Sequence, residues 1–225
     1  MSGSGFLIDD WTVVTVGHLL VNHCGCARGM RIWAGRGGDE NTIESRDGMY
    51  VAVHNGWFEG YSECNDLAFI RLSEPFNTVN PLEYKQTPIT HNGVDAAIYG
   101  YPCDLPENSS ARGNRLCVSR SSVRYGWSNS TLMLEHEGDT ERGNSGGPVV
   151  DHMGTVIALH RGWAPAVGGY KVNEAVAINH GGNDFEAFLL ILEYMSWEGG
   201  EGAKVSEEVK MLGKVKEVGG FAFAW

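Results

Sequence analysis

Short apolar runs separated by glycine- and asparagine-rich turns constrain the fold of this chain more than any other feature. Most of the runs are rich in valine, isoleucine, threonine and aromatic residues, which favour β-strands. The first run is interrupted by Asp9 and Asp10, as in a hairpin of two strands. Short strands at such intervals predict an all-β barrel or sandwich. The runs are 5–16, 31–34, 49–54, 66–72, 96–99, 117–125, 131–135, 149–150, 155–160 and 172–178.

One segment near the end departs from this pattern. In 183–197 the apolar residues recur three or four positions apart, which is a helical spacing, and Asn183 or Asp184 can cap the helix. The composition then changes to a glycine- and glutamate-rich stretch followed by a lysine- and glutamate-rich one. We therefore expect strands first, one helix near the end, and a tail over 198–225 that is disordered apart from at most one weak helix at 206–211.

The charge of the chain excludes several classes of function. It has 28 acidic and 17 basic residues, which give a formal net charge of −11. Binding to nucleic-acid phosphates or to anionic membranes requires a basic surface, so we expect neither partner. No run of about 18 apolar residues occurs, so we expect no transmembrane helix.

The five cysteines leave two interpretations open. They are either small buried residues or include one bridge, from Cys103 to Cys117, and an odd number leaves at least one thiol unpaired. Cys24 and Cys26 are separated by one residue, which does not suit a zinc site. We expect no metal and no cofactor.

The segment Gly-Asn-Ser-Gly-Gly-Pro at 143–148 carries the strongest chemical signal. Glycines on both sides of Ser145 allow a tight turn that exposes the hydroxyl and aims backbone N–H groups at one point. Acyl transfer needs such a nucleophile beside an oxyanion hole, whose donors would be the amides of Gly143 and Ser145. An ordinary glycine-rich hairpin loop is the structural alternative.

A nucleophilic serine needs a base, and the base needs a carboxylate that orients it. His18 follows the apolar run 12–17, where a rigid strand would hold its imidazole at a cleft. Asp66 stands where a polar loop enters the apolar run 66–72, so its carboxylate can be desolvated there and still reach an imidazole N–H. The ordered set of His18, Asp66 and Ser145 predicts a serine hydrolase.

Three segments together resemble the signatures of the chymotrypsin-like serine proteases: Thr-Val-Gly-His ending at His18, Asn-Asp-Leu-Ala-Phe-Ile-Arg-Leu at 65–72, and the segment around Ser145. Two more, Tyr-Gly-Tyr-Pro at 99–102 and Val-Ile-Ala-Leu-His-Arg-Gly at 156–162, resemble the glutamyl endopeptidase branch.

The resemblance implies two antiparallel β-barrels with the triad between them. We expect a first lobe over 1–100 carrying His18 and Asp66, and a second over 101–197 carrying Ser145 and ending in the helix. Ser145 is then the nucleophile, His18 the general base and acid, and Asp66 the orienting anion. Thr140 and His160 correspond to the residues with which that branch binds a glutamate side chain, and Arg142 or Arg161 would add positive potential.

The resemblance also leaves points open. Family members have a longer N-terminal part, so the first barrel is expected to have an open edge, from a truncated start or from reduction of the fold. The family implies secretion, whereas the N-terminal residues do not resemble a signal peptide, so the compartment stays open. We expect a monomeric endopeptidase acting on peptides or proteins; the alternative is an inactive module of the same fold that binds peptides or a protein partner.

Overall fold

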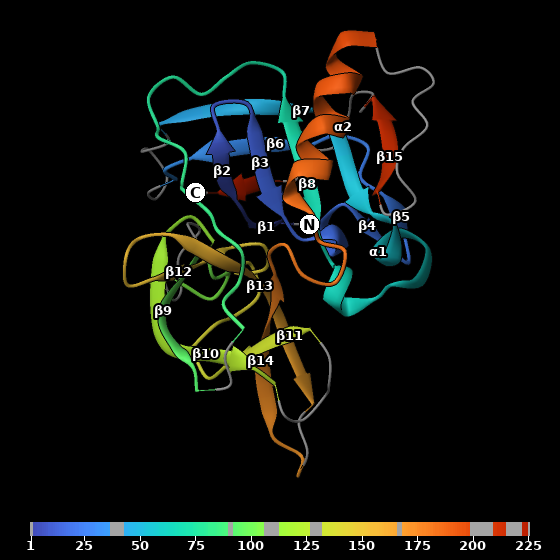
Figure 1. The fold of residues 1–225 in the computed structure, drawn as a ribbon. Helices are drawn as coiled ribbons and strands as arrows, with labels where there is room; N and C mark the ends of the chain where they lie inside the picture. The colour runs from blue at the N-terminus through green and yellow to red at the C-terminus, as the bar shows by residue number, and fades with distance from the viewer. Residues whose placement is uncertain are drawn as a thin grey trace.

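The computed structural model describes residues 2–36, 43–89, 92–105, 113–126, 132–165, 168–198, 209–214 and 222–224. Two β-rich lobes, the upper and the lower in Figure 1, are joined by an extended segment, and a long helix lies beside the upper lobe. This arrangement confirms the predicted fold class. None of the helices in the described ranges has the length and apolar character needed to span a membrane.

The first lobe is an open sheet. Its strand order is β1-β16-β6-β7-β8-β3-β2, and β15 pairs with β7 outside that path. The strands are β1 (Ser2–Ser4), β2 (Phe6–Asp9), β3 (Thr12–Thr15), β6 (Arg31–Ala34), β7 (Glu44–His54), β8 (Ala68–Leu72), β15 (Val209–Lys214) and β16 (Ala222–Ala224). Shorter elements complete the lobe: η1 (Gly17–Leu19), β4 (Val21–Asn22), β5 (Gly25–Cys26), α1 (Asn55–Gly60) and η2 (Glu63–Asn65).

The hairpin predicted in the first apolar run is present as β2 and β3. The Asp9 carboxylate accepts a hydrogen bond from the Trp11 N–H at 2.7 Å, which closes the turn, as aspartate side chains do in such positions. Every residue of β3 is buried, and the strand pairs with β8 on its other side. The end of β3 is therefore held rigidly.

The second lobe is a closed barrel of six strands in the order β10-β11-β14-β13-β12-β9. One predicted boundary needs correction. The sequence predicts a first lobe that ends at residue 100 and includes the strand at 96–99. In the structure this strand is β9, which belongs to the second lobe and pairs with β10 and β12. The strands are β9 (Val94–Gly100), β10 (Cys117–Tyr125), β11 (Met133–His136), β12 (Pro148–Asp151), β13 (Val156–Pro165) and β14 (Lys171–Ala177).

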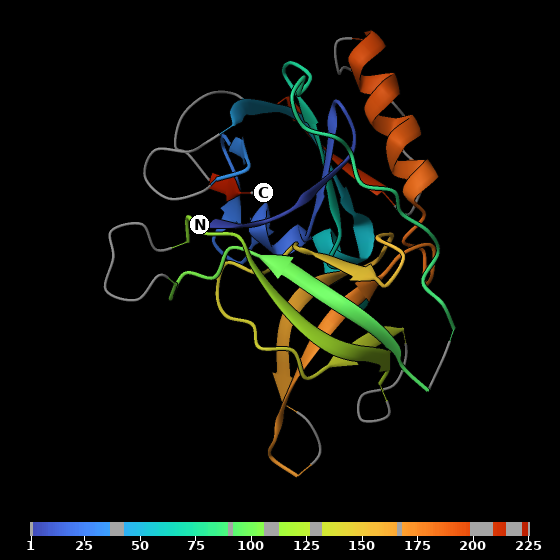
Figure 2. The ribbon, with the colours of Figure 1, turned by 90° about the vertical axis from the view of Figure 1, so that its left-hand side faces the viewer.

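The C-terminal segment returns to the first lobe. β16 lies between β1 and β6 and runs parallel to both, so the two ends of the chain meet in one sheet (Figure 2). The helix expected over 206–211 is wrong for 209–211, which belong to β15, while 206–208 lie outside the described residues. β15 pairs with residues 50–54 of β7, the part of that strand that β6 leaves unpaired, and such pairing can override a weak local helical preference.

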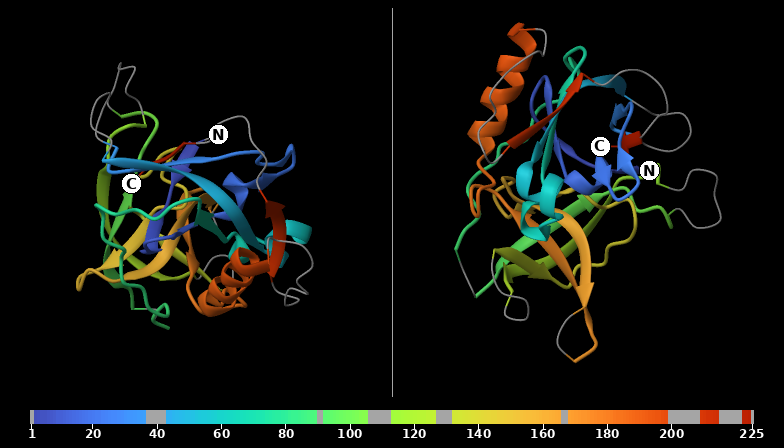
Figure 3. Two further views of the ribbon diagram at one scale, coloured as in Figure 1. Left: turned by 90° about the horizontal axis from the view of Figure 1, so that it is seen from above. Right: turned by 90° about the vertical axis from the view of Figure 1, so that its right-hand side faces the viewer.

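The predicted helix is α2 (Phe185–Glu198). Asp184 caps it, since its carboxylate accepts the N–H groups of Glu186 and Ala187. Although α2 follows the second lobe in the sequence, it packs on β7 and β8 of the first (Figure 3).

A cluster of buried apolar side chains joins the two lobes and α2, and we call it the shared core. It is separate from the cores inside each lobe. Its buried members are Phe6, Val14, Tyr50, Ala52, Leu67, Phe69, Val150, Val156, Leu159, Val176, Ile178, Phe185, Phe188, Leu192 and Met195.

The five cysteines are all unpaired. The bridge between Cys103 and Cys117 is therefore not formed. Cys117 begins β10, where its backbone is paired with Gly100, and the Cys103 sulfur lies 3.7 Å from the Ser2 hydroxyl oxygen. The other interpretation, unpaired thiols, is the one found, although Cys24 and Cys26 are exposed rather than buried.

Candidate active site

His18 and Asp66 are brought together by the pairing of β3 with β8. His18 lies in η1 directly after β3, and Asp66 follows η2 directly before β8, so the register that places Thr15 opposite Ala68 aligns them. The distance from His18 Nδ1 to Asp66 Oδ2 is 2.7 Å. The His18 backbone N–H also donates to Asp66 Oδ1 at 2.7 Å. Asp66 is fully buried, and its two hydrogen bonds to His18 fix the orientation of its carboxylate relative to the imidazole.

Ser145 comes from the other lobe and lines the same cavity as His18, a space of about 560 Å³. His18 Nε2 has no hydrogen-bond partner among the described residues, and His18 is one of the residues that line the cavity. Gly143 and Gly146 flank the serine with φ angles of 99° and 86°, which favour glycine. A side chain at Gly146 would also collide with Thr15 and with the Ser4 carbonyl. The loop that carries Ser145, residues 142–147, which we call the serine loop, therefore rests directly against the first lobe.

The backbone around Ser145 leaves two amides free. The Asn144 N–H donates to the Glu141 carbonyl and the Gly146 N–H to the His160 carbonyl. The N–H groups of Gly143 and Ser145 have no acceptor within the described part of the chain. These are the two amides that the sequence singles out as oxyanion donors.

Thr140 and His160 line the same cavity as His18 and Ser145. Of the other predicted site residues, Asp66 reaches the cavity only through His18, and Gly143 precedes Ser145 in its loop without lining the cavity. His160 is buried at the centre of β13. Its Nδ1 lies 3.1 Å from Nε2 of His136, which is buried at the end of β11. Sequence reasoning missed His136 because its only local signal is a position at the edge of a predicted strand.

The hydrogen bonds of the two histidines determine where their protons lie. His136 Nδ1 accepts the Gly138 N–H at 3.2 Å, so the neutral ring carries its proton on Nε2 and donates it to His160 Nδ1. His160 then carries its own proton on Nε2. Burial lowers the pKa of His136 to about 4. Burial, and then the nearby His136, His18 and Arg161, lower the pKa of His160 well below its ordinary value.

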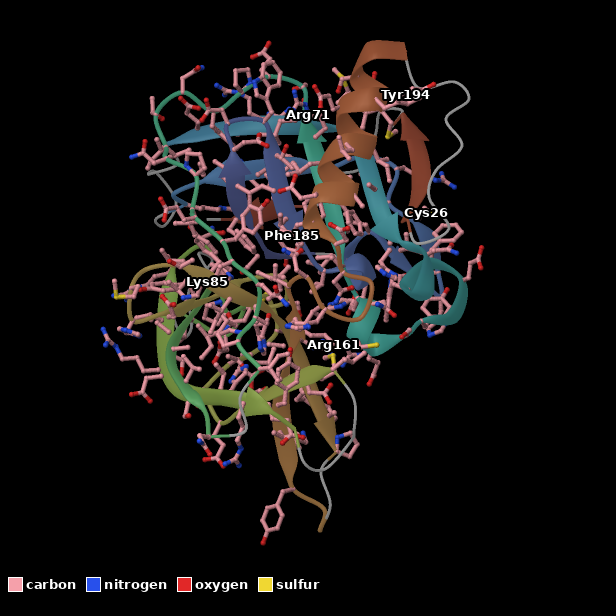
Figure 4. All side chains as sticks on the ribbon, viewed as in Figure 1. Cys26, Arg71, Lys85, Arg161, Phe185 and Tyr194 are labelled. Carbon is pink, nitrogen blue, oxygen red and sulfur yellow. The ribbon has the colours of Figure 1, made fainter. Side chains whose placement is uncertain are left out.

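Arg161 lies at the junction of the two lobes (Figure 4). Its guanidinium donates to Glu63 at 2.6 Å and to Glu174 at 3.2 Å, and its Nε lies 3.4 Å from Asp66 Oδ2 without hydrogen-bond geometry. Acidic partners therefore offset the charge of Arg161. Arg142 and Lys171 also line the cavity and place basic groups there in an otherwise acidic chain.

The comparisons with known proteins bear on this geometry. A family model described as a trypsin-like peptidase domain matches residues 3–159. The chain belongs to the trypsin-like peptidase family. A curated relative, the uncharacterized protein y4bJ of Sinorhizobium fredii (strain NBRC 101917 / NGR234), is 27% identical over 95 residues. That match covers 42% of this chain and 14% of the relative, so the chain spans only a small part of the relative's length.

Solved structures share the fold of this trypsin-like peptidase. A Glu endopeptidase in complex with MPD matches with a TM-score of 0.69 and 21% identity, over 86% of this chain and 85% of that one. An inactivated protease paralogue of the scabies mite, SMIPP-S-I1, has a TM-score of 0.64 and 17% identity over 84% and 87% of the two chains. Neuropsin, a serine protease of mouse brain, has a TM-score of 0.60 and 18% identity over 85% and 87%.

Proposed function

We propose that this trypsin-like peptidase is a serine endopeptidase that cleaves peptide bonds after glutamate. One observation carries the proposal: a single cavity is lined by Ser145, by the imidazole of the hydrogen-bonded His18–Asp66 pair, and by Thr140 and His160. Peptides or proteins are the substrates that this fold accommodates.

The proposed reaction gives each of these groups a role. His18 Nε2 accepts the proton of the Ser145 hydroxyl as Oγ attacks the scissile carbonyl carbon. The oxyanion that forms accepts hydrogen bonds from the free amides of Gly143 and Ser145. His18 then donates its proton to the leaving amine as the C–N bond breaks, and a water molecule activated by His18 hydrolyses the acyl-enzyme. Asp66 stabilises the imidazolium and keeps the ring oriented.

The proposed preference for glutamate rests on the hydrogen-bonded pair of His136 and His160. His160 presents Nε2–H as the remaining donor of a ring whose Nδ1 is occupied, and the half-buried Thr140 supplies a hydroxyl in the same cavity. A carboxylate accepts from both donors, and the nearby charges of Arg142 and Lys171 favour an anion.

Two peptides that differ only in Glu or Gln before the scissile bond test this specificity, because the pair changes charge at almost constant shape. We expect hydrolysis of the Glu peptide to exceed that of the Gln peptide by at least about 10-fold in kcat/KM, and His160→Ala to remove most of that ratio. Equal rates for the two peptides, or faster cleavage after Lys or Phe, would contradict the glutamate preference.

Catalysis itself is tested with the Ser145→Ala variant and a serine-directed phosphonate probe. We expect the probe to label the wild-type chain at Ser145, and Ser145→Ala to lose both labelling and hydrolysis while it keeps its melting temperature. A folded wild-type chain that the probe does not label would instead support the inactive binding module.

A further inference from the structure

Ser4 is a buried residue of β1 whose backbone and side chain bond to three parts of the chain, including the serine loop. Its backbone N–H donates to the Ser145 carbonyl at 2.8 Å, and its hydroxyl donates to the Gly143 carbonyl at 2.6 Å. The same hydroxyl accepts the Tyr101 N–H at 3.0 Å. The Ser4 carbonyl accepts the Thr15 hydroxyl at 2.7 Å. Ser4 therefore connects the end of β3, three residues before His18, with the loop that carries Ser145.

The hydrogen bonds to the backbone carbonyls of this loop show which peptide units Ser4 fixes in place. Four consecutive carbonyls, those of residues 142–145, are all occupied by N–H or O–H donors. Cys103 and Gly147 supply the donors for residues 142 and 144, and Ser4 supplies both of the others. The peptide unit with the Ser145 N–H thus lies between two units that Ser4 anchors. The unit with the Gly143 N–H has one such neighbour.

This anchoring matters because the loop backbone is conformationally permissive. Gly143 has a φ of 99°, and glycine rotates between such states at little cost. The unit between residues 143 and 144 has two anchors, the Ser4 hydroxyl on the Gly143 carbonyl and the Glu141 carbonyl on the Asn144 N–H. Without the Ser4 hydroxyl only the bond to Glu141 would remain, so the unit would be held less firmly and the amides on either side would be less well aligned. An oxyanion hole depends on donors that are fixed before the reaction.

We infer that Ser4 is a positioning residue that holds the Gly143 and Ser145 amides in place to stabilise the oxyanion. The inference rests on the proposed function, since it concerns the same reaction. Ser4 does not line the cavity that holds His18 and Ser145, so its effect on a substrate passes through the loop.

The test compares ligands that do and do not place an oxygen in the oxyanion hole. In a peptide aldehyde ending in the aldehyde analogue of Glu, Ser145 Oγ adds to the carbonyl carbon. The serine proton moves to His18 Nε2, the electron pair of the C=O π bond moves to the former carbonyl oxygen, which becomes the oxyanion, and nothing is released. In the matched reduced-bond peptide, a CH₂ group replaces the scissile carbonyl, so no oxygen reaches the amides.

Three variants of the full chain provide the comparison. Ser4→Ala removes the hydroxyl, and Ser4→Cys keeps a weaker donor of similar size. Thr87→Val is the matched control, because the buried Thr87 hydroxyl likewise donates to one carbonyl, that of Ile157, and accepts one amide, that of Ile178. Thr87 does not contribute to the cavity.

For Ser4→Ala we expect kcat on the Glu peptide to fall about 10-fold or more, with KM within about twofold. A fall of about 10-fold is smaller than the fall in kcat expected when an oxyanion donor is removed altogether. The aldehyde should bind weaker by a similar factor and the reduced-bond peptide equally well. Ser4→Cys should fall between Ser4→Ala and wild type. Thr87→Val and Ser4→Ala should both have a lower melting temperature than the wild-type chain. Thr87→Val should nevertheless keep the wild-type kcat, aldehyde affinity and affinity for the reduced-bond peptide. If Ser4→Ala does not fold, the same readings on Ser4→Cys decide.

Each contrary result has its own meaning. Wild-type kcat and aldehyde affinity in a folded Ser4→Ala chain would overturn the inference and leave the proposed function intact. Equal weakening of the aldehyde and the reduced-bond peptide would also overturn it, because the damage would then be general. A wild-type chain without hydrolysis or aldehyde binding would refute the proposed function, and the inference with it.

Discussion

At the scale of single residues, the buried pair of His136 and His160 makes the free energy of unfolding depend on pH. Neither ring has a carboxylate among its hydrogen-bond partners in the described ranges, and His136 is bonded to a backbone amide and to the other histidine. The fold therefore keeps both rings neutral. The same feature makes protonation of the pair unfavourable in the folded state.

The first prediction is a loss of stability in mild acid. The pKa of His136 is 6.5 before burial and about 4 in the folded protein, so between these values the unfolded chain binds a proton that the folded chain does not. The free energy of unfolding should fall as the pH drops from about 6.5 to about 4, by about 3 kcal/mol for His136 alone. His160 adds to the loss in the same direction.

Urea unfolding at several pH values between 4 and 7 measures this loss. His136→Gln cannot titrate at this position, so we expect its free energy of unfolding to depend less steeply on pH than that of the wild-type chain. If the free energy of unfolding of His136→Gln depends on pH as steeply as that of the wild-type chain, the loss of stability in acid does not come from His136.

Sequence reasoning reached the residues that have a local signature and missed those that act through space. His18, Asp66 and Ser145 stand at strand or loop positions visible in the chain. His136 and Ser4 carry no such signal. His136 meets His160 only through the pairing of both their strands with β14, and Ser4 meets Gly143 only after two lobes pack together. Contacts set by register and docking are not encoded in local composition.

At the scale of elements, the strands and the long helix were predictable because their apolar residues repeat with the period of the element. The strands 31–34 and 117–125 have the predicted bounds, and the helix 183–197 is α2 with small shifts at its ends. The C-terminal strands were not predictable. β16 is three residues long and depends on β1 and β6 for its hydrogen bonds, so its conformation is decided by distant neighbours.

The second prediction concerns β16, which is the only described strand between β1 and β6. Proline at position 223 would remove a backbone donor from the middle of the ladder, whereas alanine there would keep it. We expect Phe223→Pro to lower the free energy of unfolding by about 1–3 kcal/mol relative to Phe223→Ala, which is the cost of leaving a backbone acceptor without its donor.

Activity follows stability in this case, because β1 includes Ser4. Phe223→Pro should therefore also reduce kcat on the Glu peptide, and Phe223→Ala should reduce it less. Equal stability and activity in the two variants would show that the parallel ladder of β16 does not support the site.

At the scale of the whole molecule, the candidate site lies between two lobes, and the shared core is what holds them together. His18 and Asp66 belong to the first lobe and Ser145 to the second, so their common cavity depends on how the lobes dock. α2 connects the second lobe to the face of β7 and β8. Its Phe188 stacks on Phe69, with ring centroids 4.5 Å apart and an interplanar angle of 20°.

The third prediction is that the two lobes unfold together. Phe188→Ala would leave a cavity in the shared core, and such truncations cost about 4 kcal/mol when the residue is fully buried, as Phe188 is. Leu190→Ala is the control on the same helix, because Leu190 is 65% exposed.

Hydrogen exchange followed for β8 and for β10 reports each lobe separately. We expect Phe188→Ala to lower the denaturant midpoint of both strands to the same extent, because losing contacts in the shared core weakens the packing of each lobe on the other. Leu190→Ala should move neither midpoint by much. Two separate midpoints in the wild-type chain would mean that the lobes are independent units. The cavity between them would then be set by the cross-lobe bonds of Arg161 and Ser4 rather than by the shared core.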